Sequence, residues 1–410
     1  MSMKNYSLSL KSCPPTIEIN LNSSKSESNR LLIIQSLSEN RTNLRNISEA
    51  NDTKLLRELI KSNSDSVWDA RDAGTTMRFL LSYLSMMKDG VTLTGTDRMK
   101  KRPVKVLVDA LKEIGAEISY TENEGYPPVN IDTKINQRKN SISIRGDISS
   151  QYISSLLMIA PILPNGLEIN VIPPFYSKPY VMMTLNLMKN FGIKYLISGK
   201  HISIKNQQYA EANYEVESDW SAASYWYSIM SLNNKIKNIK LNGLRKKSFQ
   251  GDQVIQKIMS LFNVKTTFVE DGVVLENKNF FCDYLELDFK DCPDLAQTIL
   301  IVAAYHRTKL KLFGVESLKI KETDRLQAMS NELKKIGVNF YEDNRAWILD
   351  KREGDFPSEV EIDTYDDHRI AMSFAPLASE INLRIINPKV VNKSYPSFWE
   401  DIKKSGYEVI

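Results

Sequence analysis

A short charged segment late in the chain carries residue types that proton transfer requires. It reads Lys321-Glu322-Thr323-Asp324-Arg325. On a helix, Lys321 and Arg325 would be i,i+4 neighbours on one face, with Glu322 beside them. Two cations held that close repel each other, which favours a bound anion between them. The segment therefore predicts an anion site next to an acid, although Glu322 could equally serve only to offset the two positive charges.

A second carboxylate, Asp294, follows Pro293 at the predicted start of another helix. An acid and a base paired inside a cationic pocket suit proton transfer on an anionic substrate. The competing interpretation is that Asp294 only caps its helix.

The N-terminal third carries a polar segment that runs directly into an apolar stretch at residues 31–37; it reads Ser23-Ser24-Lys25-Ser26-Glu27-Ser28-Asn29-Arg30. Hydroxyls at the cap and the free N–H groups of a first helical turn bind anions, and Lys25 and Arg30 add positive charge. Alone, this pattern is an ordinary capped helix.

The same pattern recurs along the chain, which gives it more weight. Five further polar turns open apolar stretches: Asp72-Ala73-Gly74-Thr75-Thr76-Met77-Arg78, Asp147-Ile148-Ser149-Ser150-Gln151, Ser218-Asp219-Trp220-Ser221, Cys292-Pro293-Asp294 and Tyr365-Asp366-Asp367-His368-Arg369. If such units surround a common axis, six positive helix ends converge and collect anions. The loop cations Arg98, Arg102, Lys178 and Lys393 fit this hypothesis, or are simply solvated.

Repeated elements position these turns. Four predicted helices end at Gly115, Gly192, Asn263 and Gly337, at intervals of 77, 71 and 74 residues, and Gly and Asn favour the left-handed position that ends a helix. Four strands that close in turns also recur, at residues 92–95, 239–243, 310–314 and 383–388. We therefore predict about six α/β units, three per domain.

Composition sets the broad class. The chain has 410 residues, enough for two domains, and is 42% hydrophobic and 25% charged, as in globular proteins. A net charge of +4 does not indicate a nucleic-acid or membrane-surface role. We expect no signal peptide, because residues 1–10 are polar, and no membrane span, because no apolar run is long enough. We expect no zinc site, because the three cysteines (Cys13, Cys282, Cys292) and three histidines (His201, His306, His368) are scattered. An odd number of cysteines in no metal-binding spacing favours a reducing cytoplasmic location.

Eight motifs together resemble those of the 3-phosphoshikimate 1-carboxyvinyltransferase (EPSP synthase) family of enolpyruvyl transferases, in the family's order and over nearly the whole chain. They are residues 24–30, 73–78, 98–103, 149–151, 177–180, 321–326, 367–369 and Lys393. The resemblance implies an α/β fold of two domains, each of three βαβαββ units around buried parallel helices, an inside-out α/β barrel. It also implies that the chain crosses between domains near Asn22 and Val216. Residues 1–22 with 217–410 would form one domain and residues 23–216 the other, with the active site in the cleft between them.

The resemblance also implies the reaction, an alkyl-group transfer on the shikimate pathway to chorismate and the aromatic amino acids. The enolpyruvyl group of phosphoenolpyruvate moves to the 5-hydroxyl of shikimate 3-phosphate, and phosphate leaves. Asp294 would accept the hydroxyl proton, Glu322 would protonate the methylene carbon, and Lys25 would also be catalytic. Phosphoenolpyruvate would be bound by Lys25, Gly74, Arg98, Gln151, Arg325, Arg369 and Lys393. Shikimate 3-phosphate would be bound by Lys25, Ser26, Arg30, Ser149, Ser150, Gln151, Ser177, Tyr180, Asp294 and Lys321.

With charge supplied by Lys and Arg, no metal and no cofactor is expected. The resemblance further implies a cytoplasmic monomer that acts on small molecules, binds no nucleic acid or membrane, and belongs to the enzymes that glyphosate targets. Five positions depart from the family pattern: Ser23, Asp72, Phe79, Trp220 and Ser317. Asp72 matters most, because a negative charge beside a phosphate would weaken binding.

Two alternatives stay open. The sister family, UDP-N-acetylglucosamine 1-carboxyvinyltransferase, usually carries a cysteine in the loop that here spans residues 95–103, and this loop has none. A non-catalytic polyanion or nucleic-acid binder would tolerate loss of Asp294 and Glu322 and would show a steep salt dependence.

Overall fold

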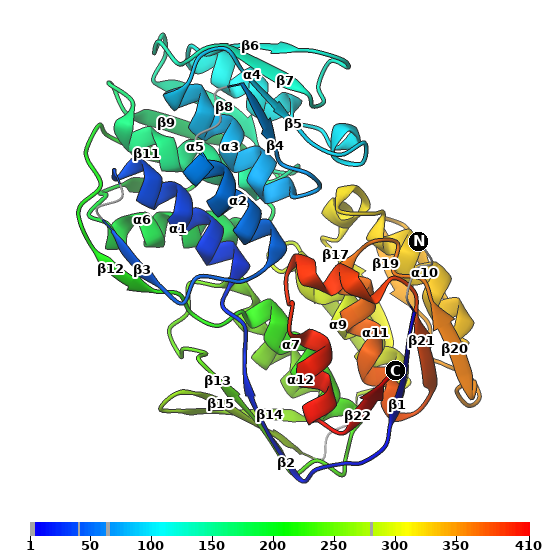
Figure 1. Ribbon diagram of the computed structural model, residues 1–410. Helices are drawn as coiled ribbons and strands as arrows, with labels where there is room; N and C mark the ends of the chain where they lie inside the picture. The colour runs from blue at the N-terminus through cyan, green and yellow to red at the C-terminus, as the bar shows by residue number, and fades with distance from the viewer. Residues whose placement is uncertain (1–4, 40–41, 63–65, 279–281) are drawn as a thin grey trace. The chain divides into compact units, whose positions relative to one another are not determined.

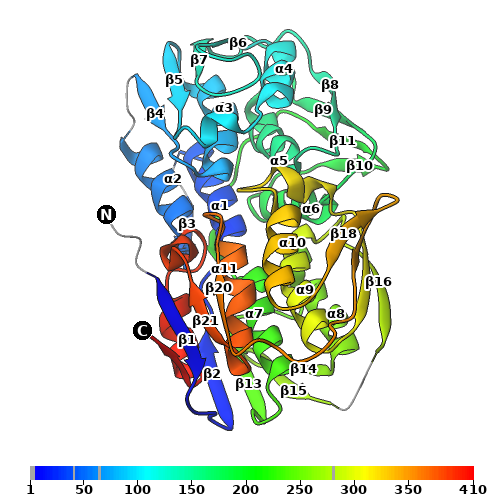
Figure 2. The same cartoon turned by 90° about the vertical axis from the view of Figure 1, so that its right-hand side faces the viewer.

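The computed structural model describes residues 5–39, 42–62, 66–278 and 282–410, and Figures 1 and 2 show it from two directions. The chain divides into two compact units. We call Ser24–Val216 the continuous unit, and Met1–Ser23 with Glu217–Ile410 the discontinuous unit.

The strands of the continuous unit form two four-stranded sheets, in the orders β4-β5-β7-β6 and β10-β11-β9-β8, and a pair of β3 with β12. In the larger sheets only β4 with β5 and β8 with β9 are parallel, and parallel neighbours need a crossover, here a helix. The bounds are β3 (Asn43–Arg45), β4 (Val67–Asp69), β5 (Val91–Thr94), β6 (Glu117–Tyr120), β7 (Val129–Thr133), β8 (Ser141–Arg145), β9 (Leu167–Ile172), β10 (Leu196–Ser198), β11 (His201–Ile204) and β12 (Asn213–Glu215).

The continuous unit has six α-helices among its described residues. They are α1 (Lys25–Leu37), α2 (Asn51–Ser62), α3 (Gly74–Met87), α4 (Lys105–Ile114), α5 (Ser150–Ile159) and α6 (Lys178–Asn190). Helices α1, α3 and α5 contact one another, and α3 and α5 bury nearly every side chain. A helix that is buried on all sides belongs to a core, so these helices form the interior of the unit (Figure 1).

The discontinuous unit repeats the plan with sheets β14-β15-β13-β2, β16-β17-β19-β18 and β20-β21-β1-β22. Again one pair in each sheet is parallel, namely β2 with β13, β16 with β17 and β20 with β21. The bounds are β1 (Tyr6–Leu10), β2 (Thr16–Asn20), β13 (Asn238–Asn242), β14 (Val264–Val269), β15 (Gly272–Asn277), β16 (Tyr284–Asp288), β17 (Lys309–Phe313), β18 (Phe340–Asp343), β19 (Ala346–Leu349), β20 (Glu359–Ile362), β21 (Asn382–Ile385) and β22 (Tyr407–Val409).

Its helices are α7 (Trp220–Leu232), α8 (Ile255–Met259), α9 (Ala296–Tyr305), α10 (Arg325–Lys335), α11 (His368–Phe374) and α12 (Phe398–Lys404). Helices α7, α9 and α11 contact one another and are almost wholly buried, and Figure 2 shows strands outside them. Within the part of the chain described, no helix is long and apolar enough to cross a membrane.

Most of the predicted elements are confirmed. Gly115, Gly192, Asn263 and Gly337 all take positive φ where the predicted helices end, and the four recurring strands are β5, β13, β17 and β21. The placement of Lys321 on a helix with Arg325 is wrong. The Asp324 side chain accepts from the backbone N–H groups of Leu326 and Gln327, so α10 begins only at Arg325 and Lys321 lies in the turn before it.

Candidate active site

A single guanidinium joins three carboxylates in the discontinuous unit. Arg325, the first residue of α10, donates from Nε to Asp367 Oδ2 at 2.7 Å and from Nη2 to Glu322 Oε2 at 2.7 Å. Its Nη1 donates to Asp294 Oδ1 at 3.0 Å. Arg325 is 2% exposed; burial lowers its pKa, but the three carboxylates outweigh burial and raise the pKa overall. Arg325 is therefore a fixed positive charge that brings both predicted catalytic acids together.

Asp294 also contacts other cations. Arg369 Nη2 donates to Asp294 Oδ2 at 2.9 Å and Arg369 Nη1 to its backbone oxygen at 3.1 Å, while Lys321 Nζ lies 4.0 Å from Oδ1. Burial raises the pKa of Asp294, but Arg369, Lys321 and Arg325 outweigh burial and hold the pKa well below its usual range. Asp294 is thus an ionised carboxylate in this structure.

A constrained turn places Asp367 and Arg369. Tyr365 and Asp366 have φ values of 50° and 54°, a left-handed conformation that costs non-glycine residues about 1–2 kcal/mol each. The Tyr365 hydroxyl donates to Glu332 Oε1 at 2.9 Å, and Glu332 is fully buried. Asp367 follows as the cap of α11 and accepts from the Arg369 N–H at 2.9 Å.

Two lysines of the discontinuous unit, Lys321 and Lys393, were also predicted as site residues. Burial lowers the pKa of Lys321, and the nearby Asp294 charge acts against burial. Lys393 is buried at the end of a short helix, Pro388–Lys393, that packs against α11.

Arg30 ties together three helices of the continuous unit. Its Nε donates to Thr184 Oγ1 on α6 at 2.7 Å, and its Nη1 to the Ser26 carbonyl on α1 at 2.8 Å. Its Nη2 lies 3.3 Å from both Ser154 Oγ on α5 and the Tyr180 carbonyl on α6. Burial lowers the pKa of Arg30 to about 10, so the group is still charged at neutral pH. Arg30 thereby brings the predicted residues Ser26 and Tyr180 close together.

Gln151 and Lys25 are also held by polar partners. Gln151 Nε2 donates to Thr75 Oγ1 at 3.0 Å, and Arg78 Nη1 donates to Gln151 Oε1 at 2.7 Å, so the starts of α3 and α5 are joined. Lys25 Nζ forms an ion pair with Asp52 Oδ2 at 3.2 Å.

Gly74 allows an arginine to approach the start of α3. A Cβ built on Gly74 would lie 2.6 Å from Arg102 Nη1 and 2.8 Å from its Cζ, distances that real Cβ atoms do not show. The absence of a side chain at Gly74 therefore lets the Arg102 guanidinium lie against the backbone.

The remaining predicted residues of this unit lie at element ends. Ser149 caps α5 and accepts from the Gln151 N–H at 3.3 Å, and Ser150 begins that helix. Ser177 precedes α6 with a φ of 55°, and Arg98 precedes the short helix Met99–Lys101.

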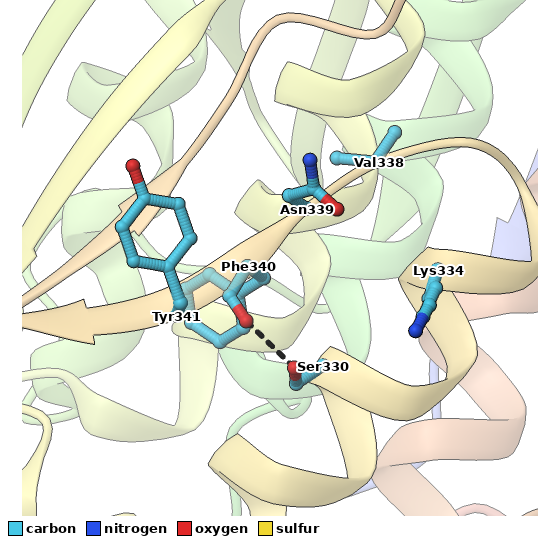
Figure 3. A pocket seen from close by; sticks show the side chains of 6 residues that line it. All are labelled: Ser330, Lys334, Val338, Asn339, Phe340 and Tyr341. Atoms are coloured by element: carbon cyan, nitrogen blue, oxygen red, sulfur yellow. Dashed lines mark hydrogen bonds between the residues drawn. The ribbon is translucent and has the colours of Figure 1, made fainter.

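Figure 3 shows a separate pocket of about 320 Å³ on α10 and β18. It is lined by Ser330, Lys334, Val338, Asn339, Phe340 and Tyr341, and Ser330 Oγ donates to the Phe340 carbonyl at 2.6 Å. None of the predicted site residues lines this pocket, so it is not the predicted substrate site.

Sequence reasoning missed several residues that hold the site together. Asp367 lies inside the polar turn at residues 365–369, and its cap position was the available signal. The sequence gives no signal for Asp52 or Asp252, because their partners Lys25 and Ser221 are 27 and 31 residues away along the chain.

Comparisons with known proteins show which family the chain resembles. The family model described as EPSP synthase (3-phosphoshikimate 1-carboxyvinyltransferase) matches residues 57–402. The 3-phosphoshikimate 1-carboxyvinyltransferase of Bacteroides fragilis strain YCH46 is 41% identical, over 98% of each chain. That of Buchnera aphidicola subsp. Cinara cedri is 36% identical, over 94% of this chain and 93% of its own.

The structural comparison agrees on the fold. A solved EPSP synthase from Acinetobacter baumannii superposes with a TM-score of 0.78 at 21% identity, over 99% of each chain. The α/β enolpyruvyl transferase fold expected from the resemblance is confirmed. This chain belongs to the EPSP synthase (3-phosphoshikimate 1-carboxyvinyltransferase) family.

Proposed function

We propose roles for residues of this chain in the family reaction. In this reaction the enolpyruvyl group of phosphoenolpyruvate passes to the 5-hydroxyl of shikimate 3-phosphate, and phosphate leaves. The observation that carries the proposal is the contact of Arg325 with both Asp294 and Glu322, at 3.0 and 2.7 Å. It supports a base and an acid held beside the same fixed charge, which suits proton removal and proton delivery on neighbouring atoms.

Asp294 accepts the proton of the attacking hydroxyl. In the structure its pKa is held low because three cations surround it, which makes it a weak base. Anionic substrates compete for Arg369 and Lys321, and this competition raises the pKa of Asp294. The carboxylate therefore becomes a stronger base when the substrates are bound.

Glu322 delivers a proton to the methylene carbon of phosphoenolpyruvate, which becomes a methyl group in the tetrahedral intermediate. When phosphate leaves the intermediate, the Glu322 carboxylate takes a proton back from this methyl group, which restores the methylene of the product and the acid form of Glu322. Its contact with Arg325 Nη2 fixes the carboxyl group, so little orientational freedom is lost in the transition state.

Cationic and polar side chains bind the two substrates in this proposal. Phosphoenolpyruvate is bound by Lys25, Gly74, Arg98, Gln151, Arg325, Arg369 and Lys393. Shikimate 3-phosphate is bound by Lys25, Ser26, Arg30, Ser149, Ser150, Gln151, Ser177, Tyr180, Asp294 and Lys321, and Lys25 also takes part in catalysis. The enzyme works as a cytoplasmic monomer on these small molecules; its three free cysteines support a reducing compartment.

The variant Glu322→Gln tests the proposal. We expect phosphate release to fall by about 10²–10⁴-fold, the range for loss of a general acid, while the Kd for shikimate 3-phosphate stays within about threefold. Glu316→Gln is the control, because Glu316 is exposed in the preceding short helix, Glu316–Ile320. Unchanged phosphate release in Glu322→Gln would remove this residue from the mechanism.

A further inference from the structure

Asp252 is a buried carboxylate that the proposed mechanism leaves without a role. It lies in the short helix Gly251–Val254 and is 3% exposed. The Ser221 hydroxyl, in the first turn of α7, donates to Asp252 Oδ2. Burying a carboxylate is costly unless charges or hydrogen bonds compensate, so the surroundings of Asp252 need a physical explanation.

Ser221 connects Asp252 to the arginine that contacts Asp294. Arg369 Nη2 lies 3.5 Å from Ser221 Oγ and 2.9 Å from Asp294 Oδ2. A hydroxyl has one proton and two lone pairs. Because the Ser221 proton is directed to Asp252, a lone pair is left to face the guanidinium.

The segment that carries Asp252 is fixed to the start of α7. The neighbouring Gln250 accepts from the Trp220 N–H at 3.0 Å and donates from Nε2 to the Ser218 carbonyl at 2.8 Å. Gln250 is also buried. The Asp252 carboxylate is therefore held at a set position relative to Ser221.

The charges around Asp252 come from several elements. Burial raises its pKa, Asp294 raises it further, and Arg369 lowers it; Asp219, the cap of α7, also raises it. The Cys292 thiol is a neighbour whose own pKa is raised, chiefly by burial. Asp252 and Asp294 thus both interact with the Arg369 guanidinium, but the pKa of Asp252 is raised and the pKa of Asp294 is lowered.

We propose that Asp252, acting through Ser221, is a positioning residue that holds the Arg369 guanidinium during the reaction. The inference rests on the proposed role of Arg369 in binding phosphoenolpyruvate. When phosphoenolpyruvate competes with Asp294 for the Arg369 guanidinium, the hold of Asp294 on Arg369 weakens. Ser221, with its proton directed to Asp252, still accepts from Arg369 and keeps the guanidinium in place for the substrate.

Steady-state kinetics of Asp252→Asn, Ser221→Ala and Ser221→Thr test this inference. Asp252→Asn and Ser221→Ala should each raise the KM for phosphoenolpyruvate about tenfold, while kcat and the KM for shikimate 3-phosphate change by less than about threefold. Ser221→Thr keeps the hydroxyl and should stay within about twofold of the parent. The double variant should be no worse than the more affected single variant, because both changes break the same connection.

Asp401→Asn is the matched control. Asp401 is also 3% exposed and accepts from a serine, Ser397 Oγ, at 2.8 Å, but on α12. Asp401→Asn should leave the KM for phosphoenolpyruvate unchanged. This result would separate an effect of Asp252 on Arg369 from a general loss of packing.

Arg369→Lys separates the inference from the proposed function. It should raise the KM for phosphoenolpyruvate by at least about tenfold, since a bidentate guanidinium is lost. If it does so while Asp252→Asn and Ser221→Ala leave that KM within twofold, or raise both KM values equally, the positioning role is wrong. If Arg369→Lys has no effect, the binding role of Arg369 and this inference both fail. Should Asp252→Asn not fold, Ser221→Ala decides alone.

Discussion

At the residue scale, the arrangement depends on a few buried charges that share partners. Arg325 contacts Asp294, Glu322 and Asp367, and all four side chains are largely buried. Removing one member of a buried ion pair typically costs about 3–5 kcal/mol, because the other charge is left uncompensated. Glu322→Gln removes the charge but keeps the shape of the side chain, and Arg325 still contacts Asp294 and Asp367, so this change is more informative than a truncation.

Gly74→Ala should weaken substrate binding without destabilising the fold. The added methyl meets the end of the Arg102 side chain, which can move away, and Ala replaces Gly at the start of α3, which gains about 0.5–1 kcal/mol in helix propensity. We expect an unchanged or slightly higher Tm and a rise of about tenfold in the KM for phosphoenolpyruvate. Thermal unfolding and steady-state kinetics check the two effects.

A double-mutant cycle identifies the cause. If the methyl acts by displacing Arg102, Gly74→Ala adds little in an Arg102→Ala background. Fully additive effects would show that the methyl acts on the substrate and not through Arg102.

Sequence reasoning could name many of the candidate residues but not their partners. Asp294, Glu322 and Arg325 were predicted as a base, an acid and a cation, and the structure brings them together. That Arg30 joins α1, α5 and α6 could not be predicted, because those contacts depend on how the helices pack. The substrate-binding roles themselves stay a prediction.

At the element scale, helix starts and ends followed from local chemistry. Ser24, Ser149, Asp219 and Asp367 accept hydrogen bonds as caps of α1, α5, α7 and α11, as the polar turns predicted. The start of α10 was misplaced because Asp324 caps it, and a capping residue inside a charged run leaves no hydrophobic periodicity to reveal the boundary.

His306, at the C-terminal end of α9, should make stability depend on pH. Its Nε2 lies 2.8 Å from Ser231 Oγ on α7, and burial lowers its pKa from 6.5 to about 4. Above about pH 6.5 the imidazole is neutral in both states. Between about pH 6.5 and 4 the unfolded chain binds a proton that the native protein does not, so stability falls as the pH falls, by at most about 3 kcal/mol.

Urea denaturation of the parent and His306→Gln between pH 7 and 5 checks this expectation. The difference in unfolding free energy should change with pH, because the variant lacks the titrating ring. His201→Gln, on strand β11, is the control for replacing a histidine away from α9. A flat difference for His306→Gln would contradict the expected protonation.

At the scale of the whole molecule, repetition made the fold predictable. Four helix ends spaced by 71 to 77 residues indicated repeated α/β units, and each compact unit contains three sheets among the described strands. The pairing of β1 with β21 and of β2 with β13 brings the N-terminal strands into a unit made mostly of the C-terminal half. Local patterns could not show this, because it joins segments more than 200 residues apart; only the family resemblance implied it.

The central claim is that this chain uses its paired acids and surrounding cations to transfer an enolpyruvyl group to shikimate 3-phosphate. A phosphate-release assay on the purified chain, with each substrate alone and with both together, tests it most directly. We predict release only when phosphoenolpyruvate and shikimate 3-phosphate are both present, with one phosphate formed per product. Absence of release with both substrates, or release when UDP-N-acetylglucosamine replaces shikimate 3-phosphate, would contradict the claim.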